Sequence, residues 1–473
     1  MRHLAIGAAV TLAILAYVNA LANGFVLDDG CVIVRNPLVT SPASAWRAFG
    51  SPYWPEAIGG GQYRPLGIVS FALDWLVSGG DPRWFHAMNV VWHAVATLLV
   101  GLLAAELLAP AAAGIAATLF ALHPVHVEAV SNVVGRLEPM AATFVLAALL
   151  MHRRSNLLGV LFFALALLSK ESAIVLIGLV AANDFILERD WRSTFTARRW
   201  QYAAYGAVTV FYAATLVAVF HNGGLRAPAR ALAGTDTVDR LVLVARVVPH
   251  YVRLLVAPLD LSSSYAPNVV SPRPEPTIMT LLGAVTIAVC AVAIWAAAHR
   301  RRWPVLAFAL VWIPIAIAPV SNVFFASGVL LAERTLYLAS AGICLAAGAI
   351  GERWLVSRPA VVVGAVTALA LTFALRTWTR TPAWRDDRAY VLTLLADHPE
   401  SYEGHLTAAR VLKGRNSLEA ASRELAIARQ LFPRDSLVFF EAAEVADRTQ
   451  RPELARALRD SARIARTLPV PAR

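Results

Sequence analysis

The sequence is poor in charged residues and in cysteine. Only 15% of its 473 residues are charged, 58% are hydrophobic, and the mean hydropathy is +0.59. Soluble proteins are about 25% charged and about 45–50% apolar, so this composition excludes an ordinary soluble domain. The three cysteines, Cys31, Cys290 and Cys344, give no basis for a disulfide framework.

Lysine is almost absent, since Lys170 and Lys413 are the lysines of the chain and arginine carries the positive charge. The formal net charge of +11 suggests nucleic-acid binding at first sight. Most of the arginines, however, stand in short loops between apolar runs, which is the pattern that orients membrane helices. We therefore expect membrane lipid, and no nucleic acid, among the partners.

Long apolar runs fill the first 380 residues. Because roughly 17–25 apolar residues cross a bilayer, we predict an all-α polytopic protein with about 11 transmembrane helices. These runs lie at 4–22, 84–107, 110–122, 137–151, 155–169, 172–187, 201–220, 278–298, 303–320, 334–350 and 359–377. The first run also has the features of a signal peptide, but the later spans favour an uncleaved helix. A shorter apolar stretch, 66–77, is predicted to lie in the membrane interface.

The arginine-rich short loops predict the orientation of the helices. Arg153-Arg154 and the loops 189–199, 300–302 and 353–358 are expected in the cytoplasm, together with the N-terminus. The first external loop, 23–83, and the segments 123–136, 170–171, 221–277 and 321–333 then lie on the extracytoplasmic side with the C-terminus. The unusual polar residues of the chain thus gather at one membrane face.

The composition changes after the last apolar run. We expect a membrane domain at 1–380 and a small helical domain at 386–473, which is rich in Ala, Leu, Arg and Glu. Pro399 and Pro433 lie 34 residues apart, with amphipathic stretches at 418–432 and 452–468. This spacing is typical of tetratricopeptide repeats, and a generic helical hairpin is the alternative. Either form is suited to binding a protein partner.

Two adjacent acids, Asp28 and Asp29, follow the first apolar run directly. We call residues 23–29 the acid-pair loop. A carboxylate at a dry membrane boundary has a raised pKa, which suits a general base that deprotonates an acceptor hydroxyl. A turn or a helix cap is the structural alternative, because Asp is favoured in both.

Cationic residues stand beside other polar positions at the same face. Arg64 is predicted to hold a lipid phosphate or to snorkel to headgroups, and Arg136 is a second candidate for phosphate. Lys170 interrupts an apolar run and therefore needs a partner, which would be Glu171 or a substrate phosphate. Arg334 is a further phosphate candidate, with Glu333 and Tyr337 as the residues that orient it.

Polar side chains also mark the run 84–107, where His86, Asn89 and His93 share one helical face. They are predicted to line a cavity or to form hydrogen bonds between helices.

A second group, His123, His126 and Glu128, has ligand-type side chains but lacks the spacing of a zinc motif. A polar cavity wall is the simpler interpretation, and a metal site is the alternative.

Seven segments together resemble the transmembrane O-mannosyltransferases with tetratricopeptide repeats (the TMTC family) and their bacterial relatives, within the GT-C glycosyltransferase superfamily. They occur in the family's order over nearly the whole membrane domain. The segments are NGFVLDDGCVIVRNP (23–37), YRPLGIVSFALDWLV (63–77), FHAMNVVWH (85–93), LHPVHVEAVSNVVGR (122–136), LLSKESAI (167–174), YVRLLVAPLDLSSSY (251–265) and AERTLYLAS (332–340).

The resemblance implies a GT-C fold, an extracytoplasmic active site and a polyprenyl-phosphate-linked hexose as donor, which is mannose in the animal members. It implies that Asp28-Asp29 is the acidic motif and that one of the two carboxylates is the base. Donor-phosphate binding is carried over to four matching positions: Arg64, Arg136, Lys170 and Arg334. No metal cofactor is implied with certainty. Animal members have many more repeats than the two expected here, so the acceptor is a protein Ser/Thr hydroxyl or a cell-envelope glycan.

We thus expect an inverting glycosyltransferase of a bacterial plasma membrane. A transporter or lipid flippase is one rival, although the internal repeats of such proteins are not evident here. A non-catalytic membrane anchor that presents the repeat domain is another.

Overall fold

The computed structural model describes residues 2–55, 61–188, 190–220, 236–266, 268–270, 276–299, 303–324, 329–433 and 435–467. The described residues form an all-α polytopic protein, as predicted. Arg300, Arg301, Arg302 and parts of the segment 221–277, on which the predicted topology also draws, lie outside the described residues.

Each predicted span coincides with a helix of the bundle. These helices are α1 (Arg2–Ala16) with η1 (Val18–Ala22), α4 (Pro82–Leu107), α5 (Pro110–Leu122), α7 (Leu137–Met151), α8 (Asn156–Ser169), α9 (Val175–Leu187), α10 (Trp191–Val219), α12 (Ile278–His299), α13 (Pro304–Ile317), α14 (Tyr337–Ser357) and α15 (Pro359–Arg380).

In the part of the chain that the structure describes, fewer than the eleven predicted spans are long and apolar enough to cross a membrane. Within the described chain, seven helices are long and apolar enough, or eight if one bent pair is counted as a single span. The helices α8 and α13 are apolar but short, and α9 has 13 residues. Crossing by these three helices therefore stays a prediction.

Proline explains the bent pair. The helix α5 ends at Leu122, and α6 (Val127–Ser131) continues at an angle of 43° after Pro124. Proline lacks the N–H group that would continue the hydrogen-bond ladder of α5, and it disfavours the helical conformation in the residue before it. The break places the polar residues 123–136 at one end of the bundle.

Small residues let the central helices pack closely. Ala9 and Ala13 of α1 and Ala113 and Ala117 of α5 are all fully buried, and α1 packs against α5. On the other side of α5, a Cβ atom added to Gly348 of α14 would lie 2.8 Å from the carbonyl oxygen of Ala112. Close backbone approach of this kind is typical of helix packing in membranes.

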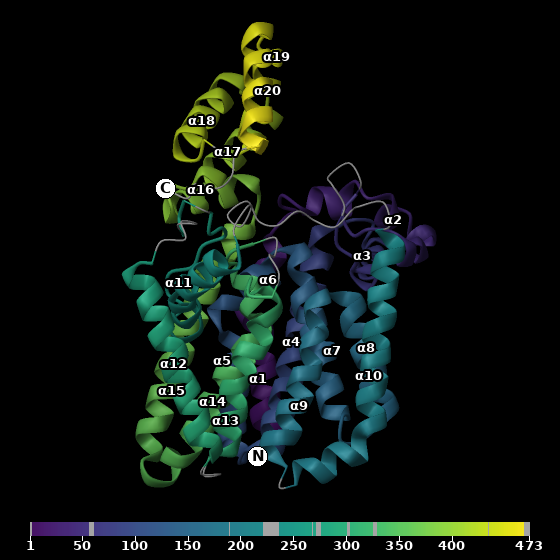
Figure 1. The fold of residues 1–473 in the computed structure, drawn as a ribbon, viewed down its shortest axis with the longest axis vertical. Helices are drawn as coiled ribbons and strands as arrows, with labels where there is room; N and C mark the ends of the chain where they lie inside the picture. Colours follow the sequence, from purple (N-terminus) through teal and green to yellow (C-terminus); the bar gives the residue numbers. More distant parts are fainter. Residues whose placement is uncertain are drawn as a thin grey trace.

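The bundle has two chemically distinct ends (Figure 1). The acid-pair end carries the acid-pair loop, α2 (Pro37–Thr40), α3 (Pro65–Ser78), α6 and the C-terminal helices. The arginine end carries the start of α1 and the turn with Arg153 and Arg154. The interfacial helix predicted at 66–77 is thus α3, and the amphipathic helix α11 (Thr237–Val256) also lies near the acid-pair end.

The C-terminal residues form a separate group of helices above the bundle (Figure 1). After α16 (Asp387–Asp397) come α17 (Tyr402–Gly414), α18 (Leu418–Leu431), α19 (Ser436–Arg448) and α20 (Pro452–Thr467). The helix α17 packs against α18 around buried residues such as Ala421 and Leu425, and α19 packs against α20 around Ala443 and Ala455. This arrangement has the two helix pairs that the proline spacing predicts, and their assignment to tetratricopeptide repeats stays a prediction.

Candidate functional site

The two acids of the acid-pair loop have different surroundings. The side chain of Asp28 is exposed, whereas Asp29 is fully buried. One carboxylate oxygen of Asp29 accepts a hydrogen bond from the backbone N–H of Val26 at 2.9 Å, and the other accepts one from Val134 at 3.0 Å. Asp29 thus fastens the loop to the segment 133–136, and Asp28 faces outward.

Burial also changes the acidity of Asp29. It raises the pKa of this carboxyl group to about 7, although the N–H groups of Val26 and Val134 act in the opposite direction. Asp29 is therefore poised to change protonation near neutral pH. Its oxygens, however, already hold the loop together, whereas the carboxylate of Asp28 is accessible from outside.

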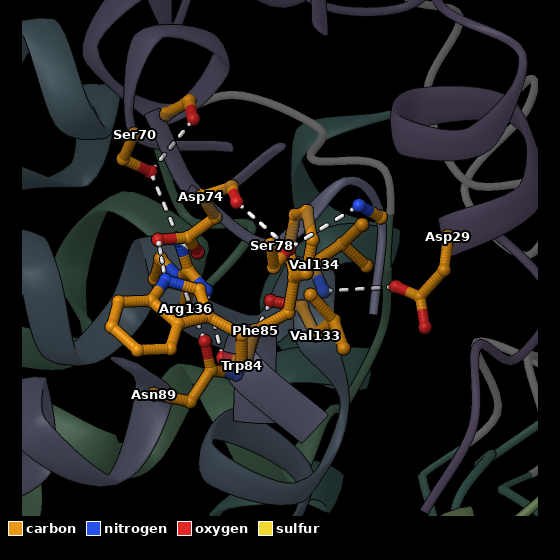
Figure 2. A network of polar contacts seen from close by, with 12 residues as sticks. Asp29, Ser70, Asp74, Ser78, Trp84, Phe85, Asn89, Val133, Val134 and Arg136 are labelled. Carbon is orange, nitrogen blue, oxygen red and sulfur yellow. Dashed lines mark hydrogen bonds and ion pairs between the residues drawn. The ribbon is translucent and has the colours of Figure 1, made fainter. Parts of the chain in front are cut away.

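Arg136 lies at the centre of a closed polar network (Figure 2). Its guanidinium forms an ion pair with Asp74, donates to the Asn89 side-chain oxygen at 2.7 Å and donates to the Phe85 carbonyl oxygen at 2.8 Å. It also stacks over the ring of Phe71, with 4.8 Å between the guanidinium carbon and the ring centre. The side chain is 1% exposed. A phosphate would have to displace these partners, so we assign Arg136 to packing of the protein.

Two buried cations at the acid-pair end have partners that the sequence did not indicate. Lys170 forms an ion pair with Glu138 of α7, whereas Glu171 and a substrate phosphate were the two partners considered from the sequence. Glu171 instead forms a bidentate pair with Arg64, with N–O distances of 2.8 and 2.5 Å. The alternative that Arg64 only snorkels to headgroups does not fit, because its side chain is 10% exposed.

Arg334 is a partly exposed cation within electrostatic reach of Asp28. It forms an ion pair with Glu128, whose other oxygen accepts from the Arg334 backbone N–H at 2.8 Å. The Arg334 side chain is 35% exposed, compared with 1% for Arg136. Glu333, by contrast, is buried and accepts from the Ser262 backbone N–H at 2.5 Å and from the Tyr265 hydroxyl at 2.8 Å. Glu333 therefore anchors the loop around Ser262 and does not orient Arg334.

The predicted cavity residues of α4 are fully buried and hydrogen-bonded to the protein. A ring nitrogen of His86 lies 3.1 Å from the carbonyl oxygen of Gly24 in the acid-pair loop. The Asn89 amide donates to three carbonyl oxygens between Val130 and Val133. His93 lies 2.8 Å from the hydroxyl oxygen of Tyr337. Of the two predicted alternatives, hydrogen bonding between helices is the one that this geometry fits.

The residues considered for a metal site do not converge. His123 contacts the carbonyl oxygen of Leu255 at 3.1 Å, His126 contacts the Ser340 hydroxyl at 2.6 Å, and Glu128 binds Arg334. Among the described residues, no group of three or more His, Cys, Asp or Glu side chains is arranged to hold a metal ion. His123, His126 and Glu128 therefore do not fit a metal centre in this arrangement.

A small pocket lies beside Lys170. Its polar lining comes from Glu138, Lys170, Ser172 and Thr335. Its apolar lining comes from Ala141, Ala142, Val145, Ala173, Ala316, Val320 and Leu338 of the surrounding helices. The lining thus combines an ion pair with apolar side chains of the surrounding helices.

Two buried tyrosines show how the charged groups converge. Burial is the main cause that raises the pKa of Tyr390, and the carboxylates of Glu128 and Asp28 add to this effect. Arg334 lowers the pKa of the same hydroxyl. Burial likewise raises the pKa of Tyr53, with Arg64 acting against it and Asp28 in favour. Asp28 thus lies within electrostatic reach of groups on both sides of the acid-pair end.

Sequence reasoning missed three of the residues that complete this region. Glu138 is the partner of Lys170, and Tyr390 and Asp387 of α16 come from beyond the membrane domain. An acid at Glu138, inside an apolar run, was a usable signal because a buried charge needs a partner. Nothing in the sequence marks Tyr390 or Asp387.

Comparison with known proteins gives a uniform result. The chain is 29% identical to a protein O-mannosyl-transferase of Caenorhabditis elegans over 86% of its own length and 60% of that relative. It is 25% identical to the protein O-mannosyl-transferases TMTC3 of Mus musculus and TMTC4 of Homo sapiens, with 90% and 87% of the chain covered. The chain spans 51% of the first of these and 64% of the second. No family model and no solved structure matches it.

The similarity to these relatives extends over most of the chain. Their names agree with the family that the seven sequence segments resemble. The protein is therefore a TMTC-like membrane protein.

Proposed function

We propose that the protein is a membrane glycosyltransferase of GT-C type. It moves a hexose, for which mannose is the first candidate, from a polyprenyl-phosphate-linked donor to a hydroxyl acceptor. The relatives are named protein O-mannosyl-transferases, which supports mannose as the sugar and a protein Ser or Thr as the acceptor. The chain spans 60% and 51% of the length of these two relatives, and a cell-envelope glycan is kept as the second candidate acceptor.

The observation that carries the proposal is that an exposed carboxylate and a partly exposed guanidinium lie within electrostatic reach of each other. Asp28 is exposed, the Arg334 side chain is 35% exposed, and both act on the hydroxyl of Tyr390. A base and a cation close together are what glycosyl transfer needs, because a proton leaves the acceptor while negative charge develops on the departing phosphate.

The donor phosphate has two further candidate contacts, Lys170 and Arg64. Lys170 lines the small pocket, and its partner Glu138 lines the same pocket. Arg64 is held by Glu171, whose side chain is 43% exposed. A phosphate that enters here replaces or joins a carboxylate as partner of a cation, and the apolar wall receives the first isoprene units of the lipid. A cation held in a water-poor site stabilises phosphate more strongly than it does in bulk water.

The chemistry is a direct displacement. The carboxylate of Asp28 takes the proton from the acceptor hydroxyl, and the hydroxyl oxygen attacks C1 of the sugar. The bond between C1 and the phosphate oxygen breaks, and the electron pair leaves with the lipid phosphate beside Arg334. One displacement inverts the configuration at C1. Asp29 has a supporting role here, because both of its oxygens are held by backbone N–H groups.

The proposed active site lies at the acid-pair end, which we place on the extracytoplasmic side. The turn with Arg153 and Arg154 lies at the opposite end, and short arginine-rich loops favour the cytoplasm. The C-terminal helices stand at the acid-pair end and are placed to receive or guide an acceptor.

Transfer of labelled sugar from purified donors tests the proposal. The full-length protein is incubated with polyprenyl-phosphate-mannose, or with its glucose and arabinose counterparts, together with acceptor peptides and cell-envelope material. Asp28→Asn is compared with Asp260→Asn, which removes an exposed acid that follows the end of α11. We expect transfer by the wild type and by Asp260→Asn, and loss of transfer in Asp28→Asn. Equal transfer by all three proteins, or none from any donor, contradicts the proposal.

A further inference from the structure

The acid-pair loop has a strained backbone. Leu27, the residue before Asp28, has a φ angle of 48°, in the left-handed region that residues with a branched side chain rarely adopt. Such a conformation persists only when surrounding contacts hold it, and it is frequent at functional sites. The contacts that hold Leu27 therefore decide where Asp28 points.

One of these contacts comes from the helix α16, far along the chain. The backbone N–H of Leu27 donates to the carboxylate of Asp387 at 2.9 Å, across 360 residues of sequence. A second contact lies beside it, since the backbone N–H of Gly24 donates to the carbonyl oxygen of Arg385 at 2.8 Å. Residues 385–387 thus hold the acid-pair loop at two points.

Neighbouring residues of the C-terminal segment contact the loop around Ser262. Arg380 pairs with Asp397 at 2.7 Å and donates to the Ser263 hydroxyl at 3.2 Å. The Ser264 hydroxyl donates to Glu403 of α17 at 2.5 Å. The loop around Ser262 is in turn held by Glu333, the neighbour of Arg334. Residues 380–403 therefore connect the acid-pair loop with the region of the accessible cation.

We propose that Asp387 is a positioning residue, which holds Leu27 in its left-handed conformation and thereby aims the carboxylate of Asp28 at the acceptor. The start of the C-terminal domain is then a part of the active site, and not only a platform for partners. This inference rests on the proposed glycosyl transfer for its catalytic consequence. The positioning itself is a property of the loop and can be measured without any substrate.

Three variants separate the contact from the charge. Asp387→Ala removes the acceptor of the Leu27 N–H. Asp387→Asn keeps an acceptor oxygen and removes the charge. Asp386→Asn removes a charge from the neighbouring position, and it keeps the oxygen that caps α16 by accepting from the Ala389 N–H at 2.8 Å.

Hydrogen exchange of the acid-pair loop is the first readout. In Asp387→Ala we expect the amides of residues 24–30 to exchange about tenfold faster, because a hydrogen bond to a charged group is lost. Asp387→Asn and Asp386→Asn are expected to stay within about threefold of the wild type. Unchanged exchange in Asp387→Ala overturns the inference, whether or not the protein transfers sugar.

Kinetics supply the second readout. Asp387→Ala is expected to lower kcat by about tenfold or more with the donor KM unchanged, and Asp387→Asn is expected to restore most of kcat. Adding Leu27→Gly reduces the effect of Asp387→Ala, since glycine adopts a positive φ without strain. A fall of the melting temperature with no change in kcat per folded molecule shows a structural role and contradicts the inference. Absence of transfer by the wild type contradicts the proposed function and leaves the exchange result to decide the positioning.

Discussion

The two ends of the helical bundle use the same kinds of side chain in opposite ways. At the arginine end, Asp184 is buried and binds His152 at 3.1 Å, Arg198 at 2.5 Å and the Tyr202 hydroxyl at 3.0 Å. The hydroxyl of Tyr205 completes this cluster, 3.2 Å from the other ring nitrogen of His152. At the acid-pair end, Asp28 is exposed and Arg334 is 35% exposed, and the charges have partners from several helices.

The difference teaches how to distinguish a structural cluster from a reactive one. Both clusters contain acids, cations and tyrosines, so composition alone does not separate them. The cluster around Asp184 is closed, and its groups serve each other. Charges that remain accessible beside a pocket can exchange a protein partner for a substrate, which is what a substrate-binding cluster requires.

The largest expected effect is the loss of sugar transfer when Asp28, the exposed acid of the acid-pair end, is replaced. Asp28→Asn removes the proposed base, and general base catalysis contributes about 10²–10⁴-fold to rate. We therefore expect kcat for sugar transfer to fall by at least about 100-fold. The melting temperature should stay within about 2 °C of the wild type because the side chain is exposed. Retention of more than a tenth of the activity is the result that contradicts this assignment.

The next effect concerns the closed cluster. Asp184→Ala leaves Arg198 and His152 without their carboxylate, and breaking a buried ion pair costs about 3–5 kcal/mol. The free energy of unfolding in detergent should fall by about this amount. Transfer per folded molecule should stay unchanged. A loss of transfer without a loss of stability reverses the roles given to the two ends.

The pH dependence of stability tests whether Asp29, unlike Asp28, is the buried acid of the pair. Its folded-state pKa of about 7 lies above the usual 3.8, so the folded protein holds this proton more tightly than the unfolded chain does. The resulting stability is present below pH 4 and is lost as the pH rises towards 7, by an amount on the order of 4 kcal/mol. Stability curves of the wild type and Asp29→Asn at several pH values measure this effect. The slope between pH 4 and 7 should be smaller in the variant, and equal slopes contradict the assignment.

The smallest expected effect is a change of the donor KM when Glu128, the partner of Arg334, is replaced. Glu128→Gln removes the charge that competes with a phosphate for this guanidinium. A partly exposed pair contributes about 1 kcal/mol or less, so we expect the donor KM to change by no more than about fivefold. Steady-state kinetics with varied donor concentration measure it. A much larger rise of KM, with kcat unchanged, indicates that Glu128 itself contacts the donor.

Much of the fold was predictable because long apolar runs report membrane helices directly. The break at Pro124 and the interruption at Lys170 were also visible in the sequence. The partners of the charges were not, because Lys170 and Glu138 meet through helix packing across 32 residues. Spacing along one helix likewise suggested a cavity for His86 and Asn89, whereas the direction of the neighbouring helices buries both.

For the site, the presence of the acid pair was predictable from the sequence. Which of the two acids is buried and which is exposed was not. Adjacent loop residues are expected to point in different directions, but only the positions of Val26 and Val134 decide that Asp29 is the buried one. Arg136 and Arg334 looked alike as phosphate candidates. Their exposed fractions of 1% and 35% depend on distant segments and separate them only in the folded chain.

The contact between Leu27 and Asp387 has a consequence for biosynthesis. The two residues are made 360 positions apart, and ribosomes add about 5–20 residues per second. The acid-pair loop is therefore in or at the membrane for tens of seconds before Asp387, which contacts it, is synthesised. If Asp387 positions Asp28 as proposed, a half-made chain carries both acids without the residue that aims them, and sugar transfer begins only after residue 387 has been made.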